Sequence, residues 1–88
     1  MRLFKSIDEK FNEIGFIKTD ENEYGIYYER KDEKYNYIHA LDLLHKQNGR
    51  HIIQSYQKNS VGEFSNMVGL TPYEAKLAVK KMGQKGWR

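Results

Sequence analysis

The chain has no cysteine, one proline and no long hydrophobic run among its 88 residues. Without cysteine it can form neither a disulfide scaffold nor a thiolate zinc site, and it suits a reducing compartment. No segment approaches the roughly 20 apolar residues that a membrane-spanning helix needs. Asp8 and Glu9 interrupt any apolar run after Arg2, so we expect no secretory signal peptide. These absences predict a small soluble domain of the cytoplasm.

Aromatic residues and charges are what the chain has in quantity. Seven Tyr, four Phe and one Trp can fill the core of one small domain, which we expect to span residues 1–88. The 15 basic and 12 acidic residues give a net charge of +3, and no acid follows Glu74. This basic end favours an anionic partner such as nucleic acid, or it complements the dipole of a terminal helix. Its cations are Lys76, Lys80, Lys81, Lys85 and Arg88.

The N-terminal segment shows helical periodicity over residues 2–14. The apolar stripe of this expected helix is formed by Leu3, Phe4, Ile7, Phe11 and Ile14. Gly15 can adopt the left-handed conformation that ends a helix, and Phe16 should then fold back onto Phe11.

The middle of the chain alternates between apolar and polar residues, which predicts strands. The expected strands cover residues 16–19, 24–31, 35–45 and 50–57. The polar segment 20–23 is expected to be a turn, and so is the charged segment 31–34.

Asn48-Gly49 is the clearest hairpin signal, because both residues accept positive φ at low cost. The register around it stays open between two alternatives. A two-residue turn would point His45 and His51 to opposite faces of the sheet. A three-residue loop would place the two histidines opposite each other on one face.

The C-terminal segment predicts a loop over 58–69 and then a helix. Thr71 fits the N-cap, Pro72 fits the first helical position, and Glu74 can complete a capping box. The inward stripe of this helix is expected to consist of Ala75, Ala78, Val79 and Met82. Gly83 or Gly86 should end the helix, and Trp87 should pack back onto the body.

This order of elements predicts an α+β fold, a two-layer sandwich in which an antiparallel meander of three or four strands carries the N- and C-terminal helices on one face. The other face then carries apolar residues of its own, and we expect it to bind another protein or a second copy of the chain. The expected interface residues are Tyr27, Ile38, Ala40 and Leu44. The alternative is that the 58–69 loop covers this face with Val61, Phe64 and Met67.

Residues that could carry chemistry are few. His39 and His45 lie six residues apart on one expected strand, roughly 20 Å at ~3.3 Å per residue, so they cannot share a metal. His45 and His51 lack a third ligand. Ser55 has Asp42 nearby across the hairpin but no histidine that the pattern places beside it. Asp42 is either a buried carboxylate with a raised pKa or a solvent-facing one.

No phosphate-binding glycine loop and no HExxH motif is present. We therefore expect no enzyme, no cofactor and no bound metal. A non-catalytic interaction domain is the leading expectation, and a nucleic-acid-binding protein is the alternative.

The order of elements is similar to that of the double-stranded RNA-binding domain, which implies phosphate contacts from the start of the last helix. Here Lys80 and Lys81 come late in that helix, and Thr71-Pro72-Tyr73-Glu74 occupies its start. The outline also resembles HicA-type mRNA-cleaving toxins, which carry a catalytic histidine after Gly-Ser on an early strand. Gly25 is instead followed by Ile26 and Tyr27, so the resemblance does not imply that activity.

Several segments look like parts of small αβββα-type proteins of Gram-positive prophages and mobile elements, a group without an established activity. These segments are residues 11–16, 37–39, 43–46, 69–71 and 85–87. The resemblance implies a bacterial or phage cytoplasm as the setting, and it implies no mechanism.

Overall fold

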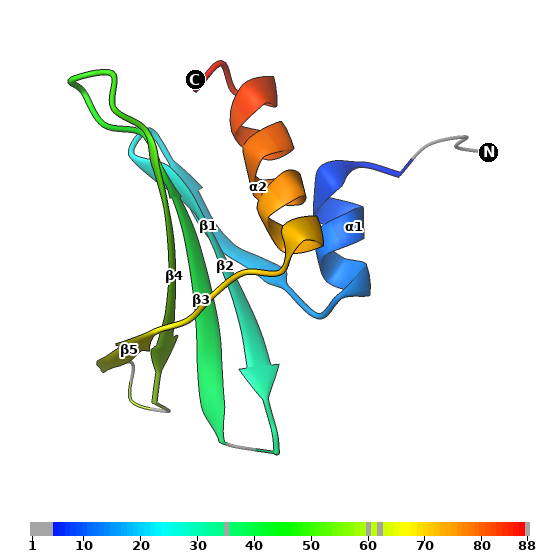
Figure 1. The fold of residues 1–88 in the computed structure, drawn as a ribbon. Coiled ribbons are helices and arrows are strands. Elements are labelled where there is room, and N and C mark those ends of the chain that lie inside the picture. The colour runs from blue at the N-terminus through cyan, green and yellow to red at the C-terminus, as the bar shows by residue number, and fades with distance from the viewer. Residues whose placement is uncertain (1–4, 35, 60, 62, 88) are drawn as a thin grey trace.

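Two helices lie on one face of a five-stranded antiparallel sheet (Figure 1). The computed structural model describes residues 5–34, 36–59, 61 and 63–87. The elements are α1 (Ile7–Glu13), β1 (Ile17–Asn22), β2 (Gly25–Asp32), β3 (Tyr37–Leu44), β4 (Ile52–Lys58), β5 (Phe64–Met67) and α2 (Pro72–Gln84). The strands lie side by side in chain order as a meander. The α+β prediction is confirmed, with one strand more than the upper number expected.

Helix α1 starts later than the apolar stripe predicted. Ser6 is its N-cap, and the Ser6 hydroxyl accepts a hydrogen bond from the Glu9 amide at 3.1 Å. This cap fixes an extended backbone at Ser6, so the predicted start at residue 2 is wrong for Lys5 and Ser6. Leu3 and Phe4 of the predicted stripe lie outside the described residues.

The end of α1 is formed as predicted. Gly15 has a φ of 94°, and the Phe16 amide donates to the Phe11 carbonyl at 2.9 Å. The two phenylalanine rings meet edge to face, with centroids 5.9 Å apart. This is the apolar contact that accompanies a glycine-terminated helix.

Strand β1 is longer than predicted, because the polar segment that we expected to be a turn is the second half of the strand. Asn22 pairs with Gly25, and the Asn22 side chain accepts hydrogen bonds from the Tyr24 and Gly25 amides. All six residues of β1 are exposed. An edge strand of this kind needs no apolar alternation, and so the polar run gave no strand signal.

The β3–β4 register settles the hairpin question. Leu44 pairs with Ile52, so in the same register the next residues toward the turn, His45 and His51, lie opposite each other. This is the arrangement that the three-residue loop predicted. The two imidazole rings lie 4.7 Å apart, and His45 stacks on Trp87 at 4.8 Å. Gly49 has a φ of 81°, as its place in the turn requires.

Strand β5 lies within the segment predicted to be a loop. Met67 pairs with Tyr56, and Phe64 pairs with Lys58, with a register shift between Gln57 and Lys58. Only four residues long, β5 covers just the C-terminal half of β4. The prediction of a loop over 58–69 is therefore wrong for Phe64–Met67.

Helix α2 has the predicted start. The Thr71 hydroxyl accepts from the Glu74 amide at 3.1 Å, and the Glu74 carboxylate accepts from the Thr71 amide at 2.9 Å. Gly83 lies inside the helix, and Gly86 with a φ of 80° follows its end. Trp87 is buried as predicted, and its amide donates to the Met82 carbonyl.

The inward side of α2 is rotated from the predicted stripe. Leu77, Ala78 and Met82 are buried, whereas Val79 is 61% exposed. The core lies between the helices and the sheet and consists of Ile7, Phe11, Phe16, Ile26, Tyr28, Leu41, Leu43, Leu77, Ala78, Met82 and Trp87. The sheet face that turns away from the helices takes no part in this core.

Candidate functional site

The candidate site is the face of the sheet that carries no helix, which we call the helix-free face. Because side chains alternate along a strand, every second residue lies on this face, including Ile38 on β3 and Tyr27 on β2. All four predicted interface residues lie on it. Tyr27, Ile38 and Leu44 are half-buried, but Ala40 is only 1% exposed and offers no contact area to a partner.

An ion pair explains the burial of Ala40. Ala40 on β3 pairs with Glu29 on one side and with Tyr56 on the other. Glu29 and Lys58 form a salt bridge although they belong to β2 and β4, which flank β3. The pair therefore crosses over β3 beside Ala40, and only a small side chain fits beneath it.

Asp42 forms the polar centre of the helix-free face. It is 8% exposed, and its carboxylate accepts a hydrogen bond from the Tyr56 hydroxyl at 2.9 Å. Burial raises the pKa of Asp42, and the Tyr56 hydrogen bond and nearby Lys58 offset part of that rise. Burial and the Asp42 carboxylate raise the pKa of Tyr56 to about 12. Of the two predicted alternatives for Asp42, the buried, hydrogen-bonded carboxylate is confirmed.

A hollow of about 310 Å³ lies over this centre. Its walls come from β1 to β4 and are mostly polar, with Asp20, Tyr27, Glu29, Asp42 and Lys58 among them. Acidic side chains outnumber basic ones in this set, so the hollow is a poor place for a phosphate.

Apolar side chains lie at both ends of the face. At one end Ile38 and Ile17 line a shared hollow, and Ile17 is 64% exposed. At the other end Tyr24, Tyr27 and Leu44 line another, and Tyr24 is 55% exposed. The face thus runs from apolar through polar to apolar along the strands.

The described residues of the 58–69 segment, Val61, Phe64 and Met67 among them, do not fold over this face, so that alternative is wrong for them. Strand β5 pairs with the edge of β4 and extends the sheet sideways. Phe64 and Met67 are 61% and 68% exposed, and Val61 is 76% exposed. Phe64 and Met67 pair with Lys58 and Tyr56, so they lie on the same side of the sheet at its β5 edge, and the Phe64 ring centroid is 5.8 Å from that of Tyr56.

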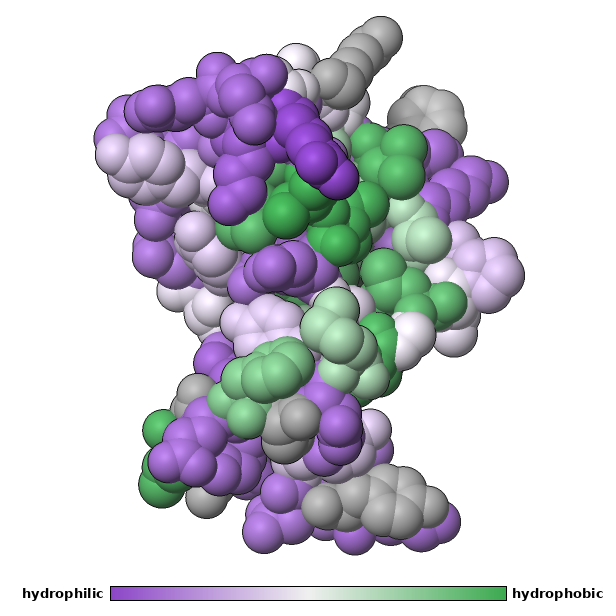
Figure 2. Space-filling view, turned by 60° about the vertical axis from the view of Figure 1, so that its left-hand side comes forward, coloured by the Kyte–Doolittle hydropathy of each residue, from purple (hydrophilic) through white to green (hydrophobic). Residues whose placement is uncertain are grey.

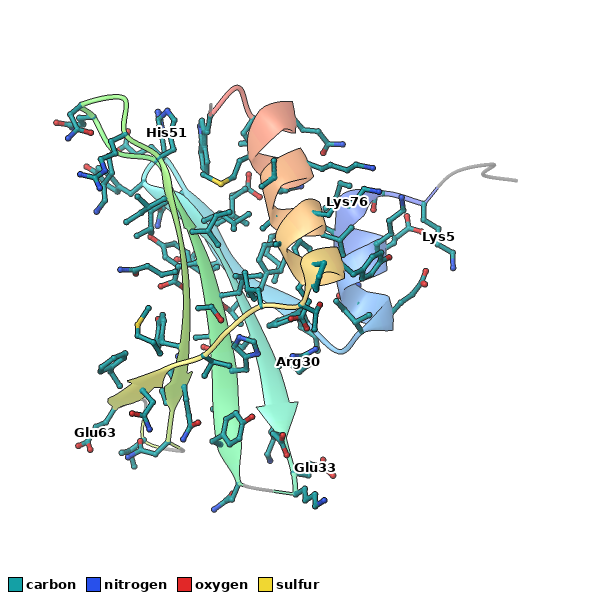
Figure 3. The ribbon with its side chains drawn as sticks, in the orientation of Figure 1. Lys5, Arg30, Glu33, His51, Glu63 and Lys76 are labelled. Atoms are coloured by element: carbon teal, nitrogen blue, oxygen red, sulfur yellow. The ribbon has the colours of Figure 1, made fainter. Side chains whose placement is uncertain are left out.

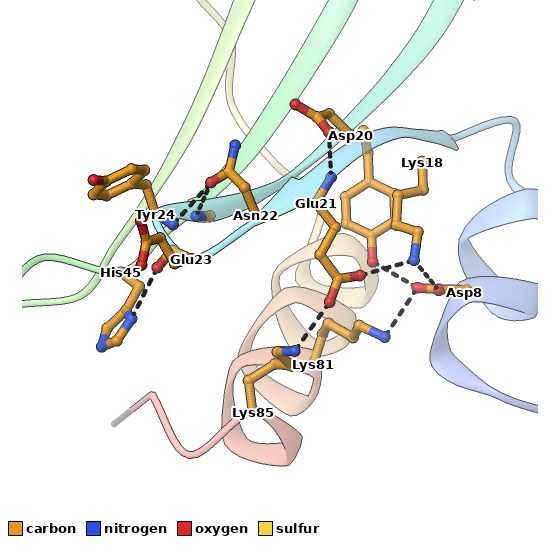
Figure 4. A network of polar contacts seen from close by, with 12 residues as sticks. Asp8, Lys18, Asp20, Glu21, Asn22, Glu23, Tyr24, His45, Lys81 and Lys85 are labelled. Atoms are coloured by element: carbon orange, nitrogen blue, oxygen red, sulfur yellow. Dashed lines mark hydrogen bonds and ion pairs between the residues drawn. The ribbon is translucent and has the colours of Figure 1, made fainter.

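The predicted basic cluster of α2 is divided by ion pairs (Figure 4). Lys81 contacts Asp8 at 3.3 Å, and Lys85 contacts Glu21 at 2.9 Å. Hydrogen bonds from Lys18 and Lys85 lower the pKa of Glu21 to about 2. Lys76 and Lys80 are exposed and form no ion pair within the described residues, and Arg88 lies outside them. The remaining basic surface is smaller than the sequence indicated.

The structure brings together Ser55 and His39, which the sequence pattern did not. The Ser55 hydroxyl lies 2.6 Å from Nε2 of His39, and Arg30 lies 3.1 Å from Nδ1. Arg30 also pairs with Glu74 at 2.9 Å, which ties the sheet to the start of α2 (Figure 3). The alternation of side chains along β2 and β3 could have predicted this cluster. Arg30 lies on the same face of β2 as the buried Tyr28, and His39 lies on the same face of β3 as the buried Leu41.

The hydrogen-bond directions in this set do not suit a nucleophile and base. A guanidinium only donates, so Nδ1 of His39 must accept from Arg30. A neutral imidazole then carries its proton on Nε2 and donates to Ser55. Burial and the Arg30 charge lower the pKa of His39, which favours this neutral form. His39 therefore has no free lone pair with which to take the Ser55 proton.

Within the described residues no three side chains of His, Cys, Asp or Glu lie close enough together to hold a metal ion. The described helices are also too short and too polar to cross a bilayer. Comparisons with protein-family models, with curated proteins and with solved structures found no match to this chain.

Proposed function

We propose that this chain is a non-catalytic interaction domain that forms a homodimer through the helix-free face. The observation that carries the proposal is the order of side chains along that face, with apolar residues at both ends and charges at the centre. A second copy laid on such a face matches apolar end to apolar end.

The charges favour one of the two ways to lay the copies together. Ile38 has Lys31 and Lys58 as its register partners, whereas Leu44 has Gly25 and Ile52. Lys58 is already paired with Glu29, but Lys31 is exposed, so a twofold axis parallel to the strands would bring the Lys31 charges of the two copies together. A twofold axis across the strands stacks Ile38 of one copy on Leu44 of the other. We propose the second arrangement.

The test is sedimentation velocity over a concentration series at low and high salt. The wild type should form a dimer that salt hardly weakens, because apolar contacts hold it. Ile38→Glu and Leu44→Glu should each shift it to monomer, since each buries a charge against an apolar residue. Tyr73→Glu, at a 48%-exposed position on α2, is the matched control and should remain a dimer.

A double variant tests the axis. In Ile38→Lys/Leu44→Glu each lysine faces a glutamate, so dimerisation should be at least about tenfold tighter than in Ile38→Lys alone. A wild type that stays monomeric at every concentration would overturn the homodimer. A folded double variant no tighter than the single one would overturn the axis.

Nucleic-acid binding through α2 is the second candidate, carried by the exposed Lys76 and Lys80. It predicts that an oligonucleotide pool co-sediments at low salt only, because phosphate contacts release counterions. Lys76→Gln/Lys80→Gln should abolish that binding and leave the dimer intact. In either case we place the domain in the cytoplasm, which the lack of cysteine supports, and we propose a prophage or mobile element as its source.

A further inference from the structure

A second surface of the molecule is a groove between β4 and α2. It has a volume of about 500 Å³ and is mainly apolar, with Ile53 on one side, Val79 and Gly83 on the other, and Trp87 at its end. In Figure 2 hydrophobic side chains gather in the upper half of the molecule beside the hydrophilic hairpin residues. The groove lies on the helix side of the sheet, so it shares no wall with the helix-free face.

The strand that borders this groove has an open edge. β5 pairs with β4 only from Tyr56 onward, and the Ser55 carbonyl accepts from the Val68 amide. Backbone groups two residues apart on a strand point to the same side. The N–H and C=O of Ile53 therefore point in the same direction as those of Ser55, to a side where the described residues provide no strand.

Gly83 keeps the opposite wall of the groove low. Glycine inside a helix lowers stability relative to alanine, and the fold does not demand it here, since a Cβ at Gly83 would meet no atom within 4 Å. Because the fold does not require a glycine at this position, its missing side chain leaves room for the backbone of another chain to approach.

The rim of the groove is basic. Lys76 lies one helical turn before Val79, and Lys80 follows it directly. His51, which lines the groove, lies at the top of β4 next to the end of α2 (Figure 3). The chain has no acid after Glu74. Two copies joined through this edge would bring two basic rims together, so a second copy is a poor occupant.

We propose that this groove binds an extended peptide segment of another protein as an added strand along Ile53, with apolar residues flanked by acidic residues on the side that faces α2. Backbone hydrogen bonds to Ile53 would supply affinity for any extended chain. Side chains alternate between the two faces of an added strand, so only every second one faces α2. The apolar groove selects apolar residues at the central positions of this set, and the lysines of α2 select acidic residues at its outer positions.

The probe is a short fluorescent peptide in which every second residue, in the order glutamate, valine, valine, glutamate, can face α2, with threonine between them. Its anisotropy should rise with protein concentration, and the Ile53 amide should exchange more slowly with solvent when the peptide is bound. That protection distinguishes an added strand from unspecific contact. A peptide in which lysine replaces every glutamate should bind at least about tenfold more weakly, because it meets a rim of its own sign.

Two variants separate binding from stability. Gly83→Leu should fill the groove and weaken peptide binding at least about tenfold, yet it should raise the melting temperature because leucine is a better helix former. Val79→Glu, at an exposed position, should weaken binding similarly through charge. Val61→Glu, at a 76%-exposed position before β5 and outside the groove lining, is the control with the same substitution and should alter binding less than about twofold.

Several results would overturn the proposal. These are no binding of the valine–glutamate peptide, unchanged exchange at Ile53, equal binding of the lysine peptide, or equal weakening by Val61→Glu. An oligonucleotide that protects Ile53 where the peptide does not would also overturn it, in favour of nucleic acid. Loss of the homodimer in Ile38→Glu bears on none of these readouts, so the two proposals fail independently.

Discussion

Replacing Arg30 with methionine tests the polar connection between the sheet and α2. The Arg30 guanidinium donates to Glu74 at 2.9 Å, to the Ile14 carbonyl at 3.1 Å and to His39 at 3.1 Å, and it lies 4.3 Å from the centre of the Phe16 ring. The Glu74 side chain is 7% exposed, so it relies on this partner. Methionine keeps the packing volume and leaves the Glu74 carboxylate buried without its cation.

The expected loss can be bounded. Breaking a buried pair by removing one partner costs about 3–5 kcal/mol. The Arg30 side chain is 32% exposed and water reaches the site, so we expect the lower end, about 3 kcal/mol. Glu74→Gln should cost less, about 1–2 kcal/mol, because the amide oxygen can still accept from the Thr71 amide and Arg30 can still reach water.

The assay is urea unfolding followed by the fluorescence of Trp87, the only tryptophan and a buried one. The double variant Arg30→Met/Glu74→Gln should lose less than the two single variants together, by at least about 1 kcal/mol. Additivity within about 0.3 kcal/mol, or an Arg30→Met loss below 1 kcal/mol, would refute the reasoning.

The pH dependence of unfolding tests whether ionised Glu74 stabilises the fold. Burial alone would raise the pKa of Glu74, but the Thr71 amide and the Arg30 guanidinium together hold that pKa below its usual value. A lowered folded-state pKa stabilises the protein fully above the unfolded value near 4.5, and the contribution is lost as the pH falls through the folded pKa. The gap between wild type and Arg30→Met should therefore narrow below pH 4.5.

Three further predictions follow from single contacts. Gly15→Ala should destabilise the fold by about 1–2 kcal/mol in thermal unfolding, because Gly15 has positive φ and a Cβ would lie 3.0 Å from the Arg30 side chain. Tyr56→Phe should raise the pKa of Asp42 further, as followed by carboxyl NMR titration, and an unchanged pKa would contradict the hydrogen bond. The Glu21 carboxylate, in the same titration, should protonate near pH 2 in the wild type and closer to its ordinary value in Lys18→Gln.

Local signals in the sequence were enough for the helix ends. The Thr71 capping box, the left-handed Gly15 and the terminal Gly86 each act through backbone groups a few residues away, so the chain specifies them without tertiary contacts. The Ser6 cap followed the same rule and was recognisable from Ser6 and Glu9, but the longer apolar stripe outweighed it.

The exposed strands were the elements that local signals could not predict. β1 is exposed at every position, and Phe64 and Met67 of β5 are mostly exposed, so no alternation of burial marks either edge strand. An edge strand is held by hydrogen bonds to one neighbour, and that neighbour lies beyond the reach of a local pattern.

The helix-free face was likewise predicted in part from local patterns, and the rest depended on tertiary contacts. Alternation alone assigned Tyr27, Ile38 and Leu44 to the face opposite Tyr28 and Leu41, because a strand has a period of two. Only the tertiary structure could bury Ala40 under the Glu29–Lys58 pair, since the ion pair joins strands that are separated by a third.

The sequence by itself thus determined that both helices form, where α2 begins, that a glycine follows the end of each helix, and the alternation of β2 and β3, because these depend on neighbours within one or two turns or strand steps. The tertiary structure decided what lies next to what. It set Ser55 against His39, paired Lys81 and Lys85 with acids, and left the Ile53 edge uncovered by any described strand. Those outcomes depend on the register and on how the helices lie over the sheet, which no local spacing encodes.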